Sequence, residues 1–361
     1  MGRKISFLFI VIVAIVLTGA GCLGFGGSVQ QGTNGAYRSL NKGDSWLSAM
    51  AVPTAAGVKT IAGVNVFRLS TDPSDPNAVY LGTRGQGLLY SYDFGQSWRT
   101  VDVMAGKFIY AVAVDPNDKC TIYVSDGPHI YKTTDCTRTW TLTFTEERPD
   151  QRFVSLGVDY GNSKIVYGAV LGGDILMSND AGRSWRAVKR FGFELQQLTA
   201  DPANPKRLYV AAYSQGLYRS DDYGETWTDL NEGLQNFNDS MRFNRLVVNP
   251  GQKDSLFWIS KYGILRSDDG GKKWDELKLI TPPGSVNIYA FAINPENQKE
   301  LYYTGTILGD KNVHVRSTFY KSTDGGKNWV TKKLPTGTIP TAMLLNLQST
   351  SQLLMGFATL N

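Results

Sequence analysis

Short apolar segments separated by turn residues fill the chain from about residue 36 to its end. In one recurring unit, an apolar segment is followed by a turn rich in Asp, Asn, Pro or Gly and then by a second apolar segment. Segments of this length and composition are typical of buried β-strands. The pattern predicts seven two-strand units: Val66–Thr83, Tyr110–Ser125, Phe153–Val170, Leu198–Ala212, Leu246–Ser260, Ala290–Thr306 and Ala342–Ala358.

A second unit alternates with the first and carries the pattern Ser/Thr-x-Asp-x-Gly-x-x-Trp. An aspartate can accept hydrogen bonds from turn amides, and a glycine suits a backbone position with positive φ. The tryptophan can then pack its ring against the neighbouring strands. We expect a distorted turn in the third copy, because Thr137 replaces the glycine. The structural residues are Asn41, Asp93, Asp135, Asp180, Asp222, Asp269 and Asp324 with Trp46, Trp98, Trp140, Trp185, Trp227, Trp274 and Trp329.

The spacing of this motif indicates how the units combine. Successive motif tryptophans are 42 to 55 residues apart, close to the length of a four-stranded propeller blade. The sequence therefore predicts an all-β fold, a seven-bladed β-propeller of four-stranded antiparallel blades. The chain begins with a motif hairpin alone and ends with a two-strand unit alone. We expect the C-terminal inner strands to pair with the N-terminal hairpin, which closes the ring and removes exposed sheet edges.

The N-terminus has the pattern of an export signal. Arg3 and Lys4 precede an apolar run, Ile5–Leu17, and small residues follow from Gly19. Cys22 then resembles the lipidated cysteine of a bacterial lipoprotein, although Gly19 stands where such sites usually have leucine. We predict a signal peptide at 1–21, a lipidated Cys22 with a flexible tether at 22–35, and one propeller at 36–361. Plain cleavage with secretion and an uncleaved anchor stay open.

Composition and cysteine usage restrict the remaining possibilities. The net charge of +5 is too small to indicate a nucleic-acid partner. Cys120 and Cys136 flank a predicted hairpin, so outside the cytoplasm they can form a disulfide; two reduced cysteines are the alternative. We expect no metal site and no cofactor, since His129 and His314 are isolated. The predicted protein is a monomer outside the cytoplasm, anchored to a bacterial membrane through its lipid.

The seven motif copies resemble the BNR/Asp-box propeller families. Seven-bladed photosystem II assembly-factor propellers share the blade number, and cyanobacterial members share a lipoprotein anchor. Sortilin-type luminal domains have similar repeats in ten blades, and sialidases carry the motif on six. Xyloglucan-active glycoside hydrolases have similar repeats in two propellers, over twice this length. In all of these the motif aspartates lie away from the ligand site, so the resemblance implies a structural role for them here.

The loops contain carboxylates but no recognisable catalytic arrangement. Glycosidases need two facing carboxyl groups, and the sequence does not show which side chains face one another. Each loop carboxylate therefore has the alternative interpretation of ordinary solvated charge, and we expect neither histidine to act as a base. The candidate carboxylates are Asp126, Glu146, Glu147, Asp150, Asp174, Glu194, Asp239 and Asp310.

One face of the propeller is favoured for binding. The motif turns and the Pro/Asn turns share a face, while the opposite face carries the loops between second and third strands and between blades. Basic and aromatic residues mix in those loops, and ligand sites are often built from loops. We predict a ligand face at Arg84, Arg148, Arg152, Arg190 and Arg242.

The sequence favours a non-enzymatic surface scaffold that binds an unknown protein or glycan. The alternatives are a carbohydrate-active glycoside hydrolase, xyloglucanase-like or sialidase-like, and a purely structural envelope protein. Two loop carboxylates close together in a groove would favour the hydrolase.

Overall fold

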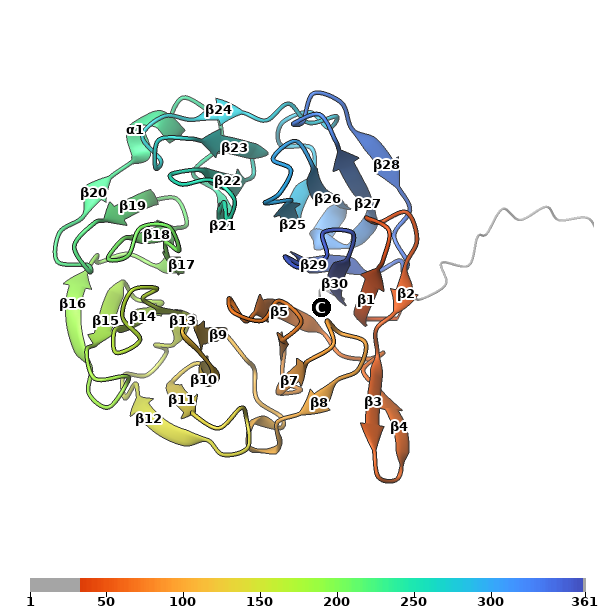
Figure 1. Cartoon of the computed structure of the whole chain (residues 1–361). Coiled ribbons are helices and arrows are strands. Elements are labelled where there is room, and N and C mark those ends of the chain that lie inside the picture. The colour runs from red at the N-terminus through yellow and green to blue at the C-terminus, as the bar shows by residue number, and fades with distance from the viewer. Residues whose placement is uncertain (1–32, 360–361) are drawn as a thin grey trace, which may run out of the picture. The chain divides into compact units, whose positions relative to one another are not determined.

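A computed structural model describes residues 33–359, which form a ring of seven four-stranded antiparallel blades (Figure 1). The predicted all-β, seven-bladed propeller is confirmed. In each blade we number the strands first to fourth from the central channel outward. Blade I contains β29 (Ile339–Leu345), β30 (Leu353–Ala358), β1 (Gly35–Ser39) and β2 (Leu47–Ser48). Blade II contains β5 (Val66–Thr71), β6 (Val79–Thr83), β7 (Leu88–Ser91) and β8 (Arg99–Thr100). Blade III contains β9 (Ala111–Asp115), β10 (Asp118–Ser125), β11 (His129–Thr133) and β12 (Thr141–Thr145).

The remaining blades repeat the same order. Blade IV contains β13 (Phe153–Val158), β14 (Val166–Val170), β15 (Asp174–Ser178) and β16 (Arg186–Arg190), and blade V contains β17 (Leu195–Ala200), β18 (Leu208–Ala212), β19 (Gly216–Ser220) and β20 (Thr228–Asp229). Blade VI contains β21 (Phe243–Val248), β22 (Leu256–Ser260), β23 (Ile264–Ser267) and β24 (Asp275–Glu276). Blade VII contains β25 (Asn287–Ile293), β26 (Leu301–Leu308), β27 (His314–Ser322) and β28 (Val330–Lys332). Short helical turns occur at Asp102–Met104, at α1 (Asn231–Leu234) and at Asp310–Asn312.

Blade I closes the ring in the predicted way. Strand β1 pairs antiparallel with β30, with Gly35 opposite Phe357 and Ser39 opposite Leu353. The two ends of the described chain thus share one sheet, which gives blade I the same four strands as the other six. The sequence did not predict a two-stranded hairpin between blades I and II, β3 (Ala51–Thr54) and β4 (Gly57–Thr60), which extends outward from the ring in Figure 1.

The core lies between neighbouring blades. The second strands β6, β14, β18, β22 and β30 are buried along their whole length, as expected for strands covered on both faces. The motif tryptophans contribute unequally, because Trp98 and Trp274 are buried while the other five are partly exposed. Trp258, the tryptophan outside the motif, is fully buried and donates from Nε1 to the Ser240 carbonyl.

A second sevenfold feature follows each inner strand. A buried Asp or Asn ends the strand, and its Oδ1 accepts the backbone N–H two residues further on, which forms an Asx-turn. The carboxamide performs this role as well as the carboxylate, because only the oxygen is used. The seven residues are Asp72, Asp115, Asp159, Asp201, Asn249, Asn294 and Asn346.

Candidate functional site

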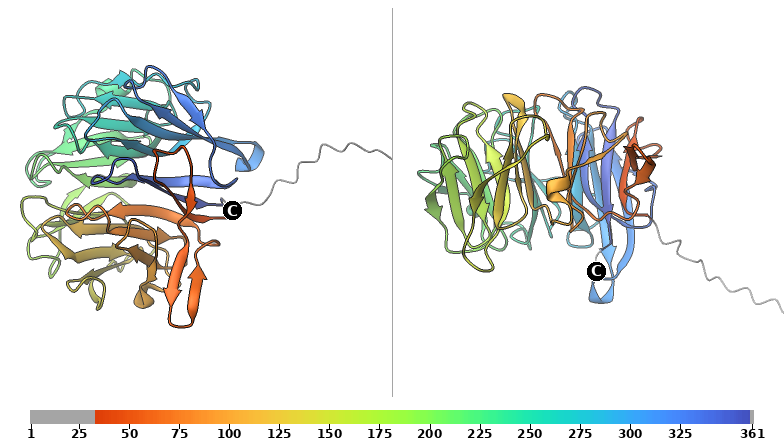
Figure 2. Two further views of the ribbon diagram at one scale, coloured as in Figure 1. Left: turned by 45° about the vertical axis from the view of Figure 1, so that its right-hand side comes forward. Right: turned by 90° about the horizontal axis from the view of Figure 1, so that it is seen from below.

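The ring has two unlike faces. The motif turns and the Asx-turns lie on one, which we name the turn face. The loops between second and third strands and between consecutive blades lie on the other, which we name the loop face. The long β26–β27 hairpin extends beyond the ring in the edge-on view of Figure 2. Its tip belongs to the loop face, because it joins a second strand to a third.

The turn face satisfies its own polar groups. In the second copy, the Ser91 hydroxyl accepts the Gly95 N–H, while Asp93 accepts the Ser97 N–H and hydroxyl. Other copies repeat these contacts. Asn41 accepts the Ser45 N–H through its amide oxygen and donates from Nδ2 to the Ser45 hydroxyl. Hydrogen bonds from the residue four positions later hold the pKa of Asp135 and Asp324 at about 2. These carboxylates are therefore committed to the turns, and the structural role inferred for the motif fits the geometry.

The third motif copy adopts the same turn as the others. Thr137 has φ 73°, whereas the glycines at this position have φ between 79° and 94°. The expected distortion is therefore wrong for the backbone, although the Thr137 N–H to Thr133 hydroxyl bond is longer, at 3.2 Å against 2.8 Å in the second copy. Cys120 and Cys136 are joined as a disulfide beside this turn.

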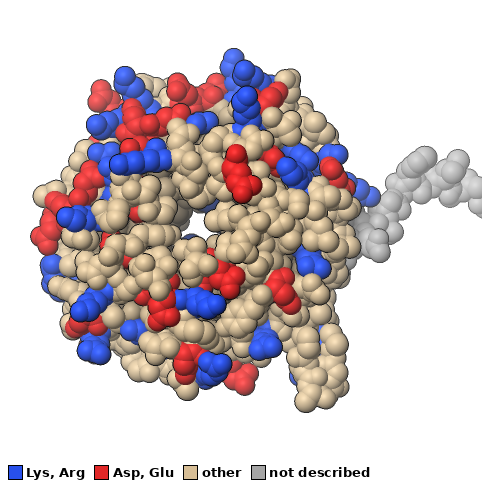
Figure 3. Space-filling model, in the orientation of Figure 1, with Lys and Arg blue, Asp and Glu red and all other residues tan. Residues whose placement is uncertain are grey.

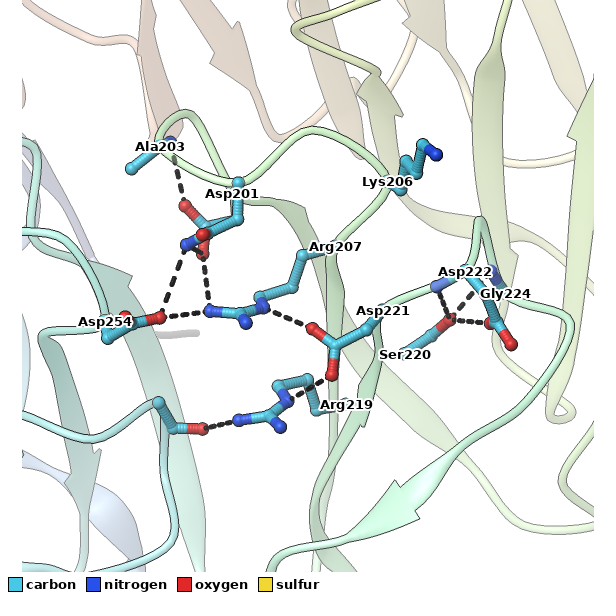
Figure 4. Close-up of polar contacts among 12 residues, drawn as sticks. Asp201, Ala203, Lys206, Arg207, Arg219, Ser220, Asp221, Asp222, Gly224 and Asp254 are labelled. Atoms are coloured by element: carbon cyan, nitrogen blue, oxygen red, sulfur yellow. Dashed lines mark hydrogen bonds and ion pairs between the residues drawn. The ribbon is translucent and has the colours of Figure 1, made fainter.

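The densest charge cluster of the turn face is also balanced internally (Figure 4). Arg207 contacts Asp221 at 2.5 Å, Asp201 at 3.6 Å and also Asp254. Arg219 contacts Asp221 at 3.0 Å and donates to the Gly270 carbonyl. Because Asp254 belongs to the next blade, this cluster joins blades V and VI and leaves no cation without an acidic partner.

On the loop face, two of the predicted carboxylates share one guanidinium. Arg148 contacts Glu146 at 2.7 Å and Asp174 at 2.7 Å, and Glu146 and Asp174 are only 7% and 10% exposed. Arg148 itself is 52% exposed. The hydrogen bond from Arg148 holds the pKa of Glu146 below its usual value of 4.5, so this carboxyl is ionised at neutral pH. The structure thus brings together one carboxylate from the loop after β12 and one from the first residue of β15.

Asp126 forms a separate group on blade III. Its carboxylate contacts Lys107 at 2.5 Å and His129 Nδ1 at 3.0 Å, and the Tyr131 hydroxyl lies 3.3 Å away. Burial raises the pKa of Asp126, but the Lys107 hydrogen bond and the charges of His129 and Lys107 outweigh it and keep this pKa below its usual value. Asp126 can therefore act as an anionic base or as a stabiliser of positive charge.

The other predicted acids and the second histidine do not assemble into a site. Glu147, Asp150, Glu194, Asp239 and Asp310 are exposed. The His314 ring contacts the Ser317 hydroxyl at 2.9 Å, and burial lowers its pKa. Within residues 33–359, no group of three His, Cys, Asp or Glu side chains is placed to hold a metal ion. In that same range, no helix is long and apolar enough to cross a membrane.

Two of the five predicted ligand-face arginines lie at the mouth of the central channel. Arg84 covers the Phe67 ring at 5.3 Å, and Arg152 covers the Tyr110 ring at 5.5 Å. Phe108 stacks on Tyr110 with ring centroids 4.2 Å apart and meets Phe67 edge-on at 4.9 Å. These three rings form an aromatic surface flanked by guanidinium groups.

The other three arginines lie further out on the loop face. Arg148 holds the carboxylate pair, and Arg190 lies 3.8 Å from the same Asp174. Arg242 donates to the Tyr213 hydroxyl at 3.4 Å. The predicted ligand face is therefore distributed over several blades, and the structure does not gather its five residues into one cluster.

The channel contains two arginines that the sequence analysis did not select. Figure 3 shows the central opening of the ring. Two cavities of about 220 and 560 Å³ both include Arg68, Gln197 and Arg245 among their lining residues, so the arginines lie where the cavities meet. The signal was present in the sequence, because each arginine occupies the third position of an inner strand, in VFRLST and FNRLVV.

No protein-family model matches the chain. It is 26% identical over 343 residues to a xyloglucanase from a Paenibacillus species, which covers 82% of this chain and 29% of that protein. Other curated relatives are also named xyloglucanases, and the chain spans about a third or less of their length.

Solved structures share the fold. The GH74 enzyme of Niastella koreensis is 15% identical with a TM-score of 0.65, over 82% of this chain and 51% of that one. YCF48 from Cyanidioschyzon merolae is 13% identical with a TM-score of 0.60, over 81% of this chain and 95% of that one. At these identities the likeness establishes the propeller fold alone.

The expectation of a non-enzymatic scaffold is wrong. The curated relatives are named as enzymes that act on xyloglucan, and the solved neighbours include GH74 enzymes. These findings favour the alternative, a glycoside hydrolase. No carboxylate pair is visible in the sequence, because Glu146 and Asp174 are 28 residues apart and meet only through Arg148.

Proposed function

We propose that the protein is a glycoside hydrolase that acts on a β-glucan of the xyloglucan class and binds it across the loop face. The observation that carries this proposal is the sequence similarity to xyloglucanases, which reaches 82% of the chain. The chain matches only part of each relative, so the reaction and the substrate are assigned to it here by inference.

The recessed carboxylates of the loop face support the proposal. Glycoside hydrolysis needs one carboxyl group that donates a proton and one that acts as base or nucleophile. Glu146 and Asp174 come from separate segments of the chain and are fixed on the two sides of one guanidinium. In the free protein Glu146 is ionised, which suits the role of base or nucleophile. We assign the role of proton donor to Asp174, the other carboxyl group that the half-exposed Arg148 contacts.

The aromatic surface at the channel mouth supports glycan binding. The apolar faces of sugar rings pack on aromatic side chains, and Phe67, Phe108 and Tyr110 present such rings beside one another. Tyr110 directly precedes β9 of blade III, and Arg152 directly precedes β13 of blade IV. The carboxylate pair lies on the same two blades, because Glu146 follows β12 and Asp174 begins β15. A glucan chain can therefore extend from the aromatic surface toward Glu146.

The test is hydrolysis of xyloglucan oligosaccharides by the purified full chain, followed through released reducing ends. We expect Glu146→Gln and Asp174→Asn each to lower kcat by about 100-fold or more, since proton transfer contributes about 10²–10⁴. The matched control is Glu147→Gln, an exposed neighbour outside the pair. Asp126→Asn tests the second acidic group. The proposal is contradicted if the unaltered chain shows no turnover. It is also contradicted if turnover survives each of the substitutions Glu146→Gln, Asp174→Asn and Asp126→Asn.

We also propose export and lipid anchoring, with a signal peptide at 1–21, a lipidated Cys22, a tether at 22–35 and the propeller at 36–361. Residues 1–32 of this N-terminal prediction lie outside the described residues, and the last tether residue, Gly35, already begins β1. The support for the proposal is the charged, apolar and small-residue order of the segment. Intact mass spectrometry of the membrane fraction should show a chain that begins at Cys22 and carries acyl groups, and Cys22→Ser should abolish them. A mature chain without acyl mass contradicts the anchor.

A further inference from the structure

Arg68 and Arg245 hold the same place on inner strands from opposite sides of the ring. Each lies four residues before the buried Asx that ends its strand, Asp72 for one and Asn249 for the other. Three blades separate β5 from β21 on one route around the ring and two blades on the other, so the strands face each other across the channel (Figure 1). The five equivalent residues are uncharged: Ala111, Ser155, Gln197, Ala290 and Ala342.

These two guanidinium groups belong to partly exposed side chains and lack the acidic partners that Arg207 has. Arg68 donates from Nη2 to the Val154 carbonyl at 3.0 Å, and its buried Nε has no acceptor. Arg245 makes no side-chain hydrogen bond or ion pair to any residue in the described range 33–359. By contrast, Gln197 at the equivalent position is satisfied by the backbone N–H and carbonyl of Leu246.

The surroundings of the pair are positive and polar, without any acid. Among the described residues that line the two cavities, none is Asp or Glu. Arg84 adds a third guanidinium, and Phe67 lies 5.3 Å from both Arg68 and Arg84. Burial, and then the charge of Arg245, lowers the pKa of Arg68 to about 10. Both guanidinium groups nevertheless remain charged at neutral pH and repel each other.

Two like charges that face each other without an acidic partner destabilise a folded protein unless something compensates them. We propose that the channel binds an oxyanion between Arg68 and Arg245. Guanidinium groups present planar sets of donors that match carboxylate, sulfate and phosphate oxygens, often in pairs. The oxyanion can be a free inorganic ion or the carboxylate of an acidic sugar, because the cavity of about 220 Å³ also offers Gln196, Asn244 and Thr341 to hydroxyl groups.

Isothermal titration calorimetry of the purified full chain at low ionic strength tests the site and separates the two sources. The probes are sulfate, glucuronate and, as the neutral control, glucose. We expect saturable binding of at least one anion and none of glucose at the same concentration. Sulfate alone identifies a free-ion site, and tighter binding of glucuronate identifies an acidic-sugar site. Absence of binding by both anions overturns the proposal, and this readout does not depend on hydrolysis.

Substitutions then locate the binding. Arg68→Gln and Arg245→Gln should each raise Kd by about ten- to a hundredfold, the loss expected for one charged hydrogen-bonding partner. The control Arg99→Gln removes an exposed arginine from β8, away from the channel, and should leave Kd unchanged. Affinity that survives both channel substitutions overturns the proposal. Selenate-soaked crystals of the unaltered protein provide a variant-free check, since an anomalous selenium peak is expected between the two guanidinium groups and its absence counts against the site.

Discussion

Two groups of arginines in this propeller have opposite surroundings. Arg207 on the turn face is enclosed by Asp201, Asp221 and Asp254 (Figure 4), whereas Arg68 and Arg245 meet in the channel without an acid. The first arrangement is complete and joins two blades. The second leaves charge uncompensated in the protein alone. The difference separates residues that hold the ring together from residues available for a ligand.

The largest effect is expected where the balanced cluster is broken. Asp201→Ala removes an Asx-turn acceptor and a charge facing Arg207, which should lower the free energy of unfolding by about 4 kcal/mol. Arg68→Met removes an unpaired charge and should be neutral or stabilising in the absence of anions. Urea denaturation of both variants measures the two values.

Asp201→Asn sharpens the same comparison. Asn249, Asn294 and Asn346 show that an amide forms the turn, so this variant removes the charge and keeps the turn. The free energy of unfolding of Asp201→Asn should lie between that of Asp201→Ala and that of the unaltered protein. A larger cost for Arg68→Met than for Asp201→Ala would reverse the assignment of the two clusters.

A smaller effect is expected from glycines of the two faces. Gly95 in a motif turn has φ +79°, and an added Cβ would lie 2.8 Å from Leu354 Cδ1. Gly85 on the loop face has φ +88° with nothing within 4 Å of an added Cβ. Gly95→Ala should therefore cost about 3 kcal/mol from backbone strain and crowding, and Gly85→Ala about 1 kcal/mol from strain alone. If thermal or urea unfolding shows equal losses of stability for Gly95→Ala and Gly85→Ala, then the turn face is no more tightly packed than the loop face at these positions.

The smallest expected effect is on the stability of the protein at acidic pH. Hydrogen bonds from the Asn328 N–H and side chain lower the pKa of Asp324 from 3.8 to about 2. Because the folded-state pKa is depressed, the stabilisation is present above pH 3.8 and is lost as the pH falls through about 2. Asp324→Asn should flatten the decline of the urea midpoint between pH 5 and 2, because an amide, which Asn41 already supplies in the first copy, does not titrate in this range. Arg68→Met should leave that decline unchanged, since arginine keeps its proton throughout this range; a flattened curve for it would be evidence against the contrast.

Much of the fold followed from local chemistry that repeats. The Ser91–Asp93–Gly95 type of turn closes within a few residues, so its spacing is visible in the sequence and predicts a blade each time. Ring closure followed because a lone hairpin at one end and a lone strand pair at the other leave matching edges. The β3–β4 hairpin escaped prediction because it lacks the repeated motif.

The candidate sites depended on distance in space. Glu146 and Asp174 come from separate segments of the chain and become a pair only through Arg148. Arg68 and Arg245 are 177 positions apart, and each alone is one arginine in an apolar strand. The sequence by itself determined the turns, the blades and their number, because those interactions are local and repeated. Only the tertiary structure decided which charges meet, because opposite sides of a ring come together solely by its closure.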